Sequence, residues 1–199
     1  MKNDFHSISK EMAYILRHHP EERGITLDAE GWADVETLLD SLNANGYAID
    51  RAGLEQLVKE NDKQRFAFRA DHTKIRASQG HSFPVNLDLE PVTPPEVLFH
   101  GTAARFLDSI RQTGLEKRNR QYVHLSPNEE TAVKVGVRHG KPVVLRVLTG
   151  KMAADGFVFY RSANGIWLTD TVPVSYLEFP DSDNQRGEIE HTHNTSNSF

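Results

Sequence analysis

The feature that most constrains the fold is a run of prolines near the middle of the chain. Residues 83–96 carry Pro84, Pro91, Pro94 and Pro95. Proline lacks the backbone N–H that helices and sheets use, so this segment is expected to be a semi-rigid linker without regular structure. The 199 residues suffice for a modest core on each side of it. We therefore predict two lobes, at 1–82 and 97–180, joined by a linker at 83–96.

The first 82 residues carry the pattern of three helices and a hairpin. Apolar residues recur at helical spacing from Ile8 to Leu16, and Pro20 stops this helix. Asp34 and Asp50 can cap two further amphipathic helices. Alternating apolar residues predict short strands at 25–27, 66–68 and 75–77. This order of elements suggests a winged-helix lobe.

Residues 97–180 predict a compact mixed α+β lobe rich in short strands. Helices are expected at 103–111, where Gly114 closes the helix, and at 128–139. Strands are expected at 97–99, 122–125, 143–147, 157–160, 166–168 and 174–179, with a hairpin turn at Asn164-Gly165. The fold class is therefore α+β. Residues 181–199 are polar and lack apolar periodicity, so a disordered tail is expected there, in which His191 and His193 are solvated.

Composition excludes several classes of protein. The chain has no cysteine, which rules out disulfides, thiolate zinc sites and cysteine nucleophiles and fits a cytoplasmic protein. No apolar run approaches the roughly 18 residues of a membrane span, and the first ten residues lack the apolar core of a secretion signal. The net charge of -5 argues against a nonspecific nucleic-acid coat. Residues 100–151, however, hold ten Lys or Arg against four Asp or Glu, so an anionic substrate would be drawn to this region.

Common catalytic motifs are absent. The sequence has no G-x-G-x-x-G after a strand, no G-x-x-x-x-G-K-[ST], no H-E-x-x-H and no G-x-S-x-G. Ten histidines are present, but none form an i, i+4 pair around a carboxylate, and adjacent His18 and His19 point to different sides of a helix. We therefore expect no metal site.

Two segments of the first lobe place basic residues beside apolar ones. Arg17 and His18 occupy the last helical turn before Pro20, where cations also simply complement the helix dipole. Arg65 stands between a polar turn and a strand and could contact a phosphate or remain solvated. Residues 79–82, Gln-Gly-His-Ser, gather donors around a glycine, although a plain turn has the same composition.

Two segments of the second lobe share this character. His100, Gly101 and Thr102 lie between a strand and a helix, where they could hold a ribose or pyrophosphate or form a capping turn. In residues 118–126, strand alternation places Arg120, Tyr122 and His124 on one face. Such a face suits a site, and it is also typical of any half-buried strand.

Together and in this order, these segments resemble the RNA 2′-phosphotransferase (KptA-type) family. The motifs are SK-x-x-x-YILRH-x-P, LD-x-x-GW, NDKQRF, IRA-x-QGHS, HGT, VHLS and RHG-x-PVVL. They stand at 9–20, 27–32, 61–66, 75–82, 100–102, 123–126 and 138–145, and the similarity spans roughly residues 7 to 179. Their joint occurrence is far more specific than any one motif.

The resemblance implies an N-terminal winged-helix lobe that grips RNA and a C-terminal lobe of the ADP-ribosyltransferase kind that binds NAD as a co-substrate. It implies that an internal RNA 2′-phosphate attacks the anomeric carbon of NAD and releases nicotinamide. The ribose 2″-hydroxyl of the resulting ADP-ribosylated RNA then attacks the phosphorus. The products are RNA with a free 2′-hydroxyl and ADP-ribose 1″,2″-cyclic phosphate, and the implied substrate is a tRNA-like RNA.

The resemblance also implies the site residues. The family's basic tetrad falls on Arg17, His18, Arg65 and Arg120, with Arg118 as the competing choice for the fourth position. The implied NAD contacts are His100, Gly101, Thr102, His124 and Ser126. Guanidinium groups suit the phosphoryl charge that grows in the second step, and His18 could donate a hydrogen bond or assist proton transfer.

Three other functions remain open on the sequence. The first is an ADP-ribosyltransferase that acts on terminal phosphates of nucleic acids and stops after one step. The second is a non-catalytic winged-helix nucleic-acid-binding protein, and the third is a metal-dependent phosphoesterase. We expect a monomer that does not bind membranes.

Overall fold

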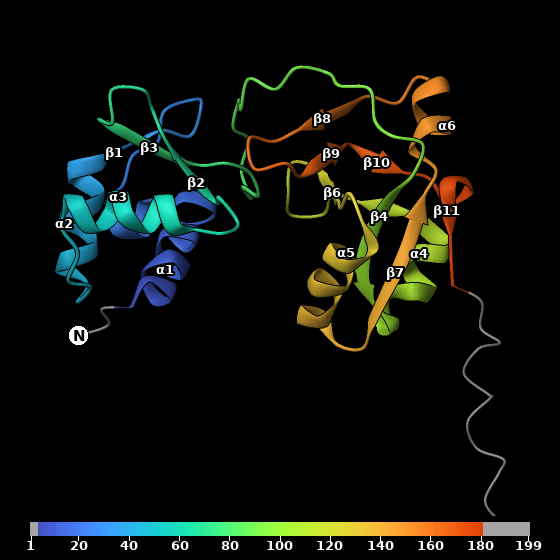
Figure 1. Cartoon of the computed structure of the whole chain (residues 1–199), viewed down its shortest axis with the longest axis horizontal. Helices are drawn as coiled ribbons and strands as arrows, with labels where there is room; N and C mark the ends of the chain where they lie inside the picture. The colour runs from blue at the N-terminus through green and yellow to red at the C-terminus, as the bar shows by residue number, and fades with distance from the viewer. Residues whose placement is uncertain (1–3, 181–199) are drawn as a thin grey trace, which may run out of the picture.

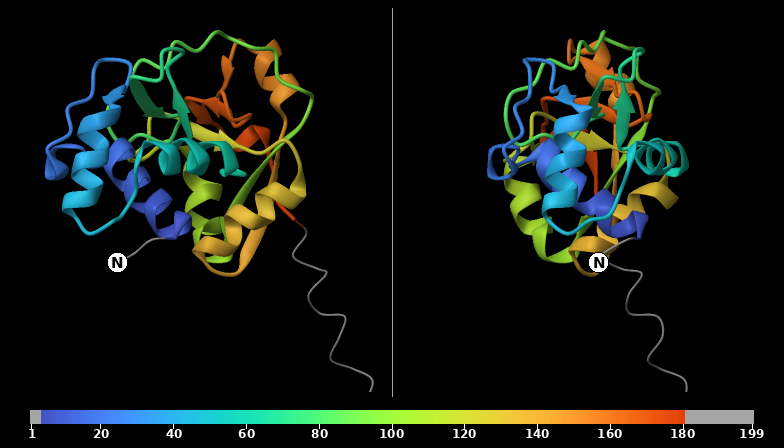
Figure 2. Two further views of the ribbon diagram at one scale, coloured as in Figure 1. Left: turned by 60° about the vertical axis from the view of Figure 1, so that its left-hand side comes forward. Right: turned by 90° about the vertical axis from the view of Figure 1, so that its left-hand side faces the viewer.

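The computed structural model describes residues 4–180, and Figure 1 shows them as two groups of elements joined by an extended segment. The three helices and three strands of the first half lie together on one side. The elements of the second half lie on the other side, and Figure 2 shows both groups from two further directions. The two groups are in contact, since Asn164 Nδ2 donates to the Lys63 carbonyl at 3.2 Å. The mixed α+β class predicted from the sequence is confirmed: residues 4–180 contain six α-helices and several small antiparallel sheets. No helix in this range is long and apolar enough to cross a membrane.

The helices of the first half begin where aspartates cap them. They are α1 (Phe5–Arg17), α2 (Val35–Ala44) and α3 (Arg51–Glu60). The side chains of Asp4, Asp34 and Asp50 accept backbone hydrogen bonds at 2.8–2.9 Å from the residue three positions later, which supplies partners to otherwise free N–H groups. The predicted caps at Asp34 and Asp50 are therefore confirmed.

The strands of the first half form one small antiparallel sheet. Its strands are β1 (Ala33–Asp34), β2 (Phe66–Phe68) and β3 (Lys74–Ala77), in the order β1-β3-β2. The hairpin of β2 and β3 is confirmed, with Phe66 opposite Ala77. The strand predicted at 25–27 is wrong. Ile25 and Leu27 alternate because both pack on the core while the backbone stays irregular.

Residues 97–180 contain eight short strands and three α-helices. The strands are β4 (Leu98–Ala103), β5 (Leu115–Glu116), β6 (Val123–Leu125), β7 (Pro142–Val147), β8 (Phe159–Arg161), β9 (Trp167–Thr169), β10 (Thr171–Val172) and β11 (Leu177–Glu178). The helices are α4 (Leu107–Thr113), α5 (Glu129–Gly136) and α6 (Thr149–Ala154). The sheets have the orders β11-β7-β4, β6-β9-β8 and β10-β5, and α5 lies against β4 and β7 (Figure 1).

Several boundaries in the second half differ from the predictions. The helix expected at 103–111 begins as a 3-10 turn (Ala104–Phe106), and that expected at 128–139 ends as one (Val137–His139). The strand expected at 174–179 begins as a 3-10 turn (Val174–Tyr176). Helix α6 and the two-residue strands β5 and β10 are additional, because such short elements carry too few residues for a periodic signal. The expected tail at 181–199 lies outside the described residues.

Two separate sets of buried side chains form the cores. The N-terminal core contains residues from Ile8 to Ala77, and the C-terminal core contains residues from Leu98 to Leu177. The segment between them has no helix or strand, as predicted, but it packs closely onto both halves. Its Asn86 N–H donates to the Ala29 carbonyl at 2.9 Å, and its Val92 N–H donates to the Phe159 carbonyl at 2.8 Å. The proline-rich segment therefore forms hydrogen bonds with both halves of the chain.

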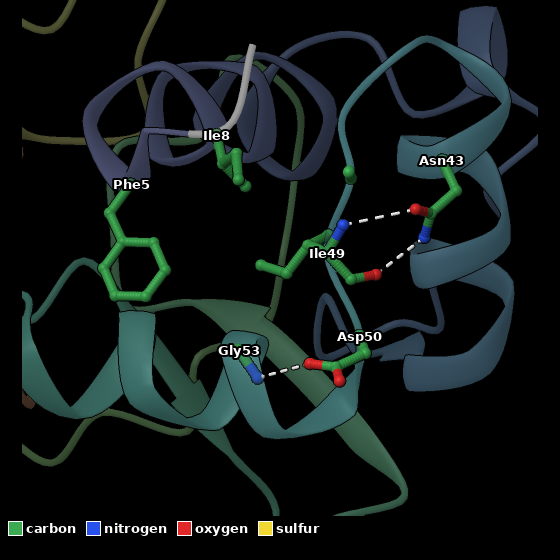
Figure 3. Close-up of a pocket in the computed structure, with 7 residues that line it drawn as sticks. Phe5, Ile8, Asn43, Ile49, Asp50 and Gly53 are labelled. Carbon is green, nitrogen blue, oxygen red and sulfur yellow. Dashed lines mark hydrogen bonds between the residues drawn. The ribbon is translucent and has the colours of Figure 1, made fainter. Parts of the chain in front are cut away.

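One hollow in the first half lies away from the predicted site residues. It has a volume of about 460 Å³ and is lined by Phe5, Ile8, Asn43, Ala48, Ile49, Asp50 and Gly53 (Figure 3). The Asn43 carboxamide closes one wall by bonding both the N–H and the carbonyl of Ile49, at 3.2 and 2.7 Å. Its polar groups are therefore occupied by the fold itself.

Candidate functional site

Arg17 and His18 lie at the end of α1. The helix stops before Pro20, and the N–H groups of His18 and His19 both donate to the Tyr14 carbonyl, at 3.2 and 3.0 Å. Arg17 is partly buried, and its Nε and Nη2 atoms are buried without a hydrogen-bond partner in the described structure. A cation that only complements the helix dipole would remain in solvent. Burial with unused donors instead suits a guanidinium that binds an anion.

Arg65 is held in a turn that connects α3 to β2. Its N–H donates to Asn61 Oδ1 at 3.1 Å, and Asn61 Nδ2 donates to Ser9 Oγ of α1 at 3.3 Å. The turn requires Gln64 to adopt a φ of 41°, in the left-handed region. The Ser78 hydroxyl supports it by donating to the Gln64 carbonyl at 2.9 Å. Asn61 thus links the backbone of Arg65 to the helix that carries Arg17.

Arg120 comes from the turn before β6. The predicted strand alternation is wrong at its start, because β6 begins at Val123 and Arg120 lies in a bend. The side chains of Arg120 and His124 are nevertheless in contact, since Arg120 Nη1 donates to His124 Nδ1 at 3.0 Å. Arg118 has a φ of 50°, and its guanidinium carbon lies 5.7 Å from the centre of the Phe106 ring. The two candidates for the fourth basic position therefore have different surroundings.

The electrostatics of the site show that these basic groups are neighbours. Burial, followed by the charges of Arg65 and Arg120, lowers the pKa of Arg17 to about 10. Burial and the charges of Arg17 and Arg120 also lower the pKa of His18. None of the salt bridges within residues 4–180 involves Arg17, Arg65 or Arg120. The cluster is therefore positively charged and lacks a protein counterion in this range.

His100 and His124 form a second polar pair beside this cluster. His100 Nδ1 lies 3.0 Å from the His124 carbonyl oxygen, so the neutral imidazole carries its proton on Nδ1 and leaves Nε2 as an acceptor. His124 has the opposite tautomer, because its Nδ1 accepts from Arg120 and Nε2 must carry the proton. Burial, then Arg120 and Arg17, lowers the pKa of His124 to about 3. Both imidazoles are neutral at pH 7, since burial also lowers the pKa of His100.

Gly101, Thr102 and Ser126 are buried at the seam where β4 meets β6 and α5. Thr102 and Ser126 are 5% and 6% exposed, and the backbones of Ser126 and Phe99 bond each other at 2.7 and 2.9 Å. A Cβ on Gly101 would lie 1.8 Å from the Ala132 carbonyl oxygen. Glycine at position 101 therefore allows α5 to pack closely against β4, where any side chain would clash. The five proposed NAD contacts stay a prediction, and among them His124 is bonded to Arg120.

Sequence reasoning singled out residues 79–82 but gave them no role. In the structure His81 is 1% exposed, and both its ring nitrogens lack a hydrogen-bond partner, as does the buried Gln79 Oε1. Burial, then Arg17 and Arg76, lowers the pKa of His81 to about 4. The signal that could have identified them is the motif IRA-x-QGHS, which places polar side chains directly after a buried strand.

One cluster of possible metal ligands exists among residues 4–180. His19, Glu21 and Glu22 bring one ligand atom each within 4.8 Å of one another. These groups already pair with each other, since His19 Nδ1 lies 3.4 Å from Glu22 Oε1, and both glutamates are exposed. Exposed acidic pairs of this kind are ordinary surface features.

The buried neutral histidines predict a stability that depends on pH. In the folded protein His81 and His124 have pKa values of about 4 and 3, below the ordinary value of 6.5. The unfolded chain therefore binds more protons below pH 6.5, and the free energy of unfolding should fall as the pH drops from about 6.5 toward 4.5, by up to ~1.4 kcal/mol per pH unit for each histidine. Urea unfolding at several pH values measures this slope. A free energy that stays constant over this window would contradict the neutral state of both groups.

The cluster of basic groups indicates the kind of ligand that the site can bind. Basic groups from the two halves of the chain lie near one another without a protein counterion among residues 4–180, beside a pair of neutral imidazoles. Such a group of cations suits a phosphorylated ligand. Residues 3–171 match the model of the RNA 2′-phosphotransferase, Tpt1 / KptA family. The chain belongs to this family.

Several relatives are similar over almost their whole length. A "probable RNA 2′-phosphotransferase" of Agrobacterium fabrum is 56% identical over 169 residues, which cover 85% of this chain and 91% of the relative. Its namesake in Flavobacterium johnsoniae is 52% identical over 173 residues, covering 87% and 95%. That of Hahella chejuensis is 49% identical over 185 residues, covering 93% and 100%.

Proposed function

We propose that the protein removes an internal 2′-phosphate from RNA by transferring it to NAD, the co-substrate of the Tpt1 / KptA family. The observation that supports this most is the Arg17 guanidinium, which is buried beside Arg65 and Arg120 with two nitrogen atoms unpaired. A doubly charged phosphate would supply the missing acceptors and offset the repulsion among the arginines. A tRNA-like RNA with a 2′-phosphate is the proposed substrate.

The proposed first step requires little general acid catalysis, because the leaving group is neutral. The RNA 2′-phosphate forms a bond to the anomeric carbon of the nicotinamide ribose as the bond to nicotinamide breaks, and nicotinamide leaves as a neutral molecule. The protein contributes orientation, because Arg17, Arg65 and Arg120 hold the phosphate while His100 and His124 face the ribose. The free Nε2 acceptor of His100 and the Nε2–H donor of His124 can bond ribose hydroxyls.

The proposed second step concentrates charge on the phosphorus. The ribose 2″-hydroxyl forms a P–O bond and loses its proton, while the bond to the RNA 2′-oxygen breaks and this oxygen gains a proton. The products are RNA with a 2′-hydroxyl and ADP-ribose 1″,2″-cyclic phosphate. The arginines stabilise the negative charge of this transition state, because a preorganised guanidinium in a partly dry site needs no rearrangement. His18, whose pKa is lowered, is neutral at pH 7 and can exchange a hydrogen bond or a proton with the phosphate oxygens.

We propose that the two halves of the chain have different roles in the reaction. The helices and sheet of residues 1–82 act as a winged-helix lobe that grips RNA and supplies Arg17, His18 and Arg65. Residues 97–180 act as an ADP-ribosyltransferase-like lobe that binds NAD and supplies Arg120. The connection at 83–96 supports this division, since it bonds to Ala29 on one side and Phe159 on the other. We further propose a monomer that needs no metal.

The test is an incubation of the purified protein with a short RNA that carries one internal 2′-phosphate, with and without NAD and in the presence of a chelator. We expect NAD-dependent loss of the phosphate and formation of the cyclic phosphate. A terminally phosphorylated RNA is the second substrate. ADP-ribosylation of that RNA without any cyclic phosphate from the internal one would favour a terminal-phosphate ADP-ribosyltransferase. Loss of activity in the chelator would indicate a metal-dependent reaction, and RNA binding without turnover would indicate a binding protein.

A further inference from the structure

The hairpin of β8 and β9 contacts the turn of the first half that carries Arg65 (Figure 1). At its tip, Asn164 Nδ2 donates to the Lys63 carbonyl oxygen at 3.2 Å, across 101 positions of the sequence. This bond joins the two halves of the chain directly, whereas the bonds of Asn86 and Val92 run through the connecting segment. The second half therefore touches the first half two residues before a proposed catalytic arginine.

The Asn164 carboxamide has a fixed orientation. The buried Ser162 hydroxyl donates to Asn164 Oδ1 and accepts from the Ile166 N–H at 3.1 Å. The Lys63 carbonyl can only accept a hydrogen bond, so the Nδ2 atom must face it. Turn asparagines commonly use their side chain within their own turn, and here Oδ1 does so. The Nδ2 donor instead serves the other half of the chain.

The turn that accepts this bond leaves Arg65 little freedom. The Gln64 N–H donates to the Asn61 carbonyl at 2.9 Å, and the Arg65 N–H donates to Asn61 Oδ1 at 3.1 Å. The Ser78 N–H and hydroxyl donate to the Arg65 and Gln64 carbonyls, at 2.8 and 2.9 Å. Lys63 lies within this bonded turn, so a displacement of Lys63 also displaces the backbone of Arg65.

We propose that Asn164 is a positioning residue for Arg65, and that its bond to Lys63 holds the turn against the second half before RNA binds. The second half supplies Arg120, so the bond sets the separation of the two arginines. The arginines of the site repel one another while no anion is bound, and a neutral contact between the halves offsets this repulsion. The inference rests on the proposed function, in which arginines of both halves bind one phosphate.

The test is the Asn164→Ala variant, whose Kd for a short RNA with one internal 2′-phosphate is measured by fluorescence anisotropy without NAD. Asn164 is outside the left-handed region, so alanine can adopt its backbone conformation. We expect the Kd to rise about 3- to 10-fold, because one neutral hydrogen bond no longer favours the arrangement that binds RNA. With saturating RNA and NAD, the rate should stay within about twofold of the parent, since bound RNA restores this arrangement.

Two further variants connect the effect to the bond and to Arg65. Asn45→Ala is the matched control, because the Asn45 carboxamide also donates to a backbone carbonyl, that of Ser41 at 2.8 Å, but within the first half. Its Kd should stay within about twofold of the parent. In the Arg65→Ala background, Asn164→Ala should change the Kd by less than about twofold, because the side chain that it positions is gone. If Asn164→Ala is too unstable, Asn164→Gly provides the same comparison, since Gly-Gly also suits a hairpin turn.

The separation of the two halves is measured independently of RNA binding. The chain has no cysteine, so Asp40→Cys and Glu129→Cys can carry two spin labels at exposed positions of α2 and α5. We expect pulsed electron spin resonance to give a broader distance distribution for Asn164→Ala than for the parent. The 2′-phosphorylated RNA should narrow it again. Equal distributions for the two proteins would overturn the role of the bond.

The outcomes separate this role from the function on which it rests. A parent protein that does not remove the phosphate with NAD overturns the proposed function, and the spin-label distances then still decide whether Asn164 holds the halves together. An active parent combined with an Asn164→Ala variant whose Kd rises less than about threefold overturns only the positioning role. Independent, multiplicative effects of the Asn164 and Arg65 substitutions would overturn it as well.

Discussion

Replacement of Arg120 by alanine should lower the rate of cyclic phosphate formation by about 10²- to 10³-fold. The guanidinium is fixed before substrate binds, because Nη1 donates to His124 Nδ1 at 3.0 Å and the Arg120 N–H donates to the Lys117 carbonyl at 2.9 Å. Its charge should matter most in the second step, when negative charge on the phosphoryl oxygens is greatest. Release of nicotinamide should therefore continue while ADP-ribosylated RNA accumulates, as chromatography of both products would show.

Arg118→Ala is the matched control for this prediction. It removes the same type of side chain two positions away, but the Arg118 guanidinium lies by the Phe106 ring. We expect its turnover to remain within threefold of the parent. Equal losses in both variants, or an Arg120→Ala variant that forms the cyclic phosphate at the parent rate, would show that Arg120 does not have this role.

Gly101→Ala should destabilise the protein by about 3 kcal/mol or more, at the upper end of what overpacking costs. A Cβ would lie 1.8 Å from the Ala132 carbonyl oxygen and 3.0 Å from the Gly136 nitrogen, so α5 would have to move away from β4. Both contacts are with backbone atoms, which cannot rotate aside as a side chain would. Urea unfolding with a fitted free energy measures the loss.

Gly46→Ala separates this steric effect from backbone strain. Gly46 has a φ of 88°, but a Cβ there would meet nothing within 4 Å. Its cost should therefore be limited to the left-handed conformation, about 1–2 kcal/mol. If Gly101→Ala cost no more than Gly46→Ala, the close approach of α5 to β4 would not determine the effect.

Elements with a local signal were predictable from the sequence. The caps at Asp34 and Asp50, the stop at Pro20 and the hairpin turn at Asn164-Gly165 depend on neighbouring residues, and the structure contains all of them. Pairs that depend on distant contacts were not predictable. Strand β1 forms because Ala33 pairs with Ile75, more than forty residues away. A strand of two residues is too short to show an alternating pattern in the sequence.

The sequence indicated which residues belong to the candidate site, but it did not indicate how they are arranged in space. The family resemblance implied Arg17, His18, Arg65 and Arg120, and the structure brings these residues together. Alternation misplaced Arg120 on a strand, because a left-handed residue at Arg118 forms a turn there. The burial of His81 was also beyond reach, since it depends on the docking of 79–82 onto α1. The roles of the tetrad stay a proposal.

The division of the basic residues between two cores makes the site sensitive to how these cores are held. Arg17 and Arg65 come from the first half of the chain and Arg120 from the second, so their like charges repel one another where the two halves meet. In the proposed function, a phosphate bound by all three arginines replaces this repulsion with attraction and connects the two halves of the chain. Substrate then acts as a reversible crosslink, and the energy of its binding also stabilises the contact between the two halves of the chain.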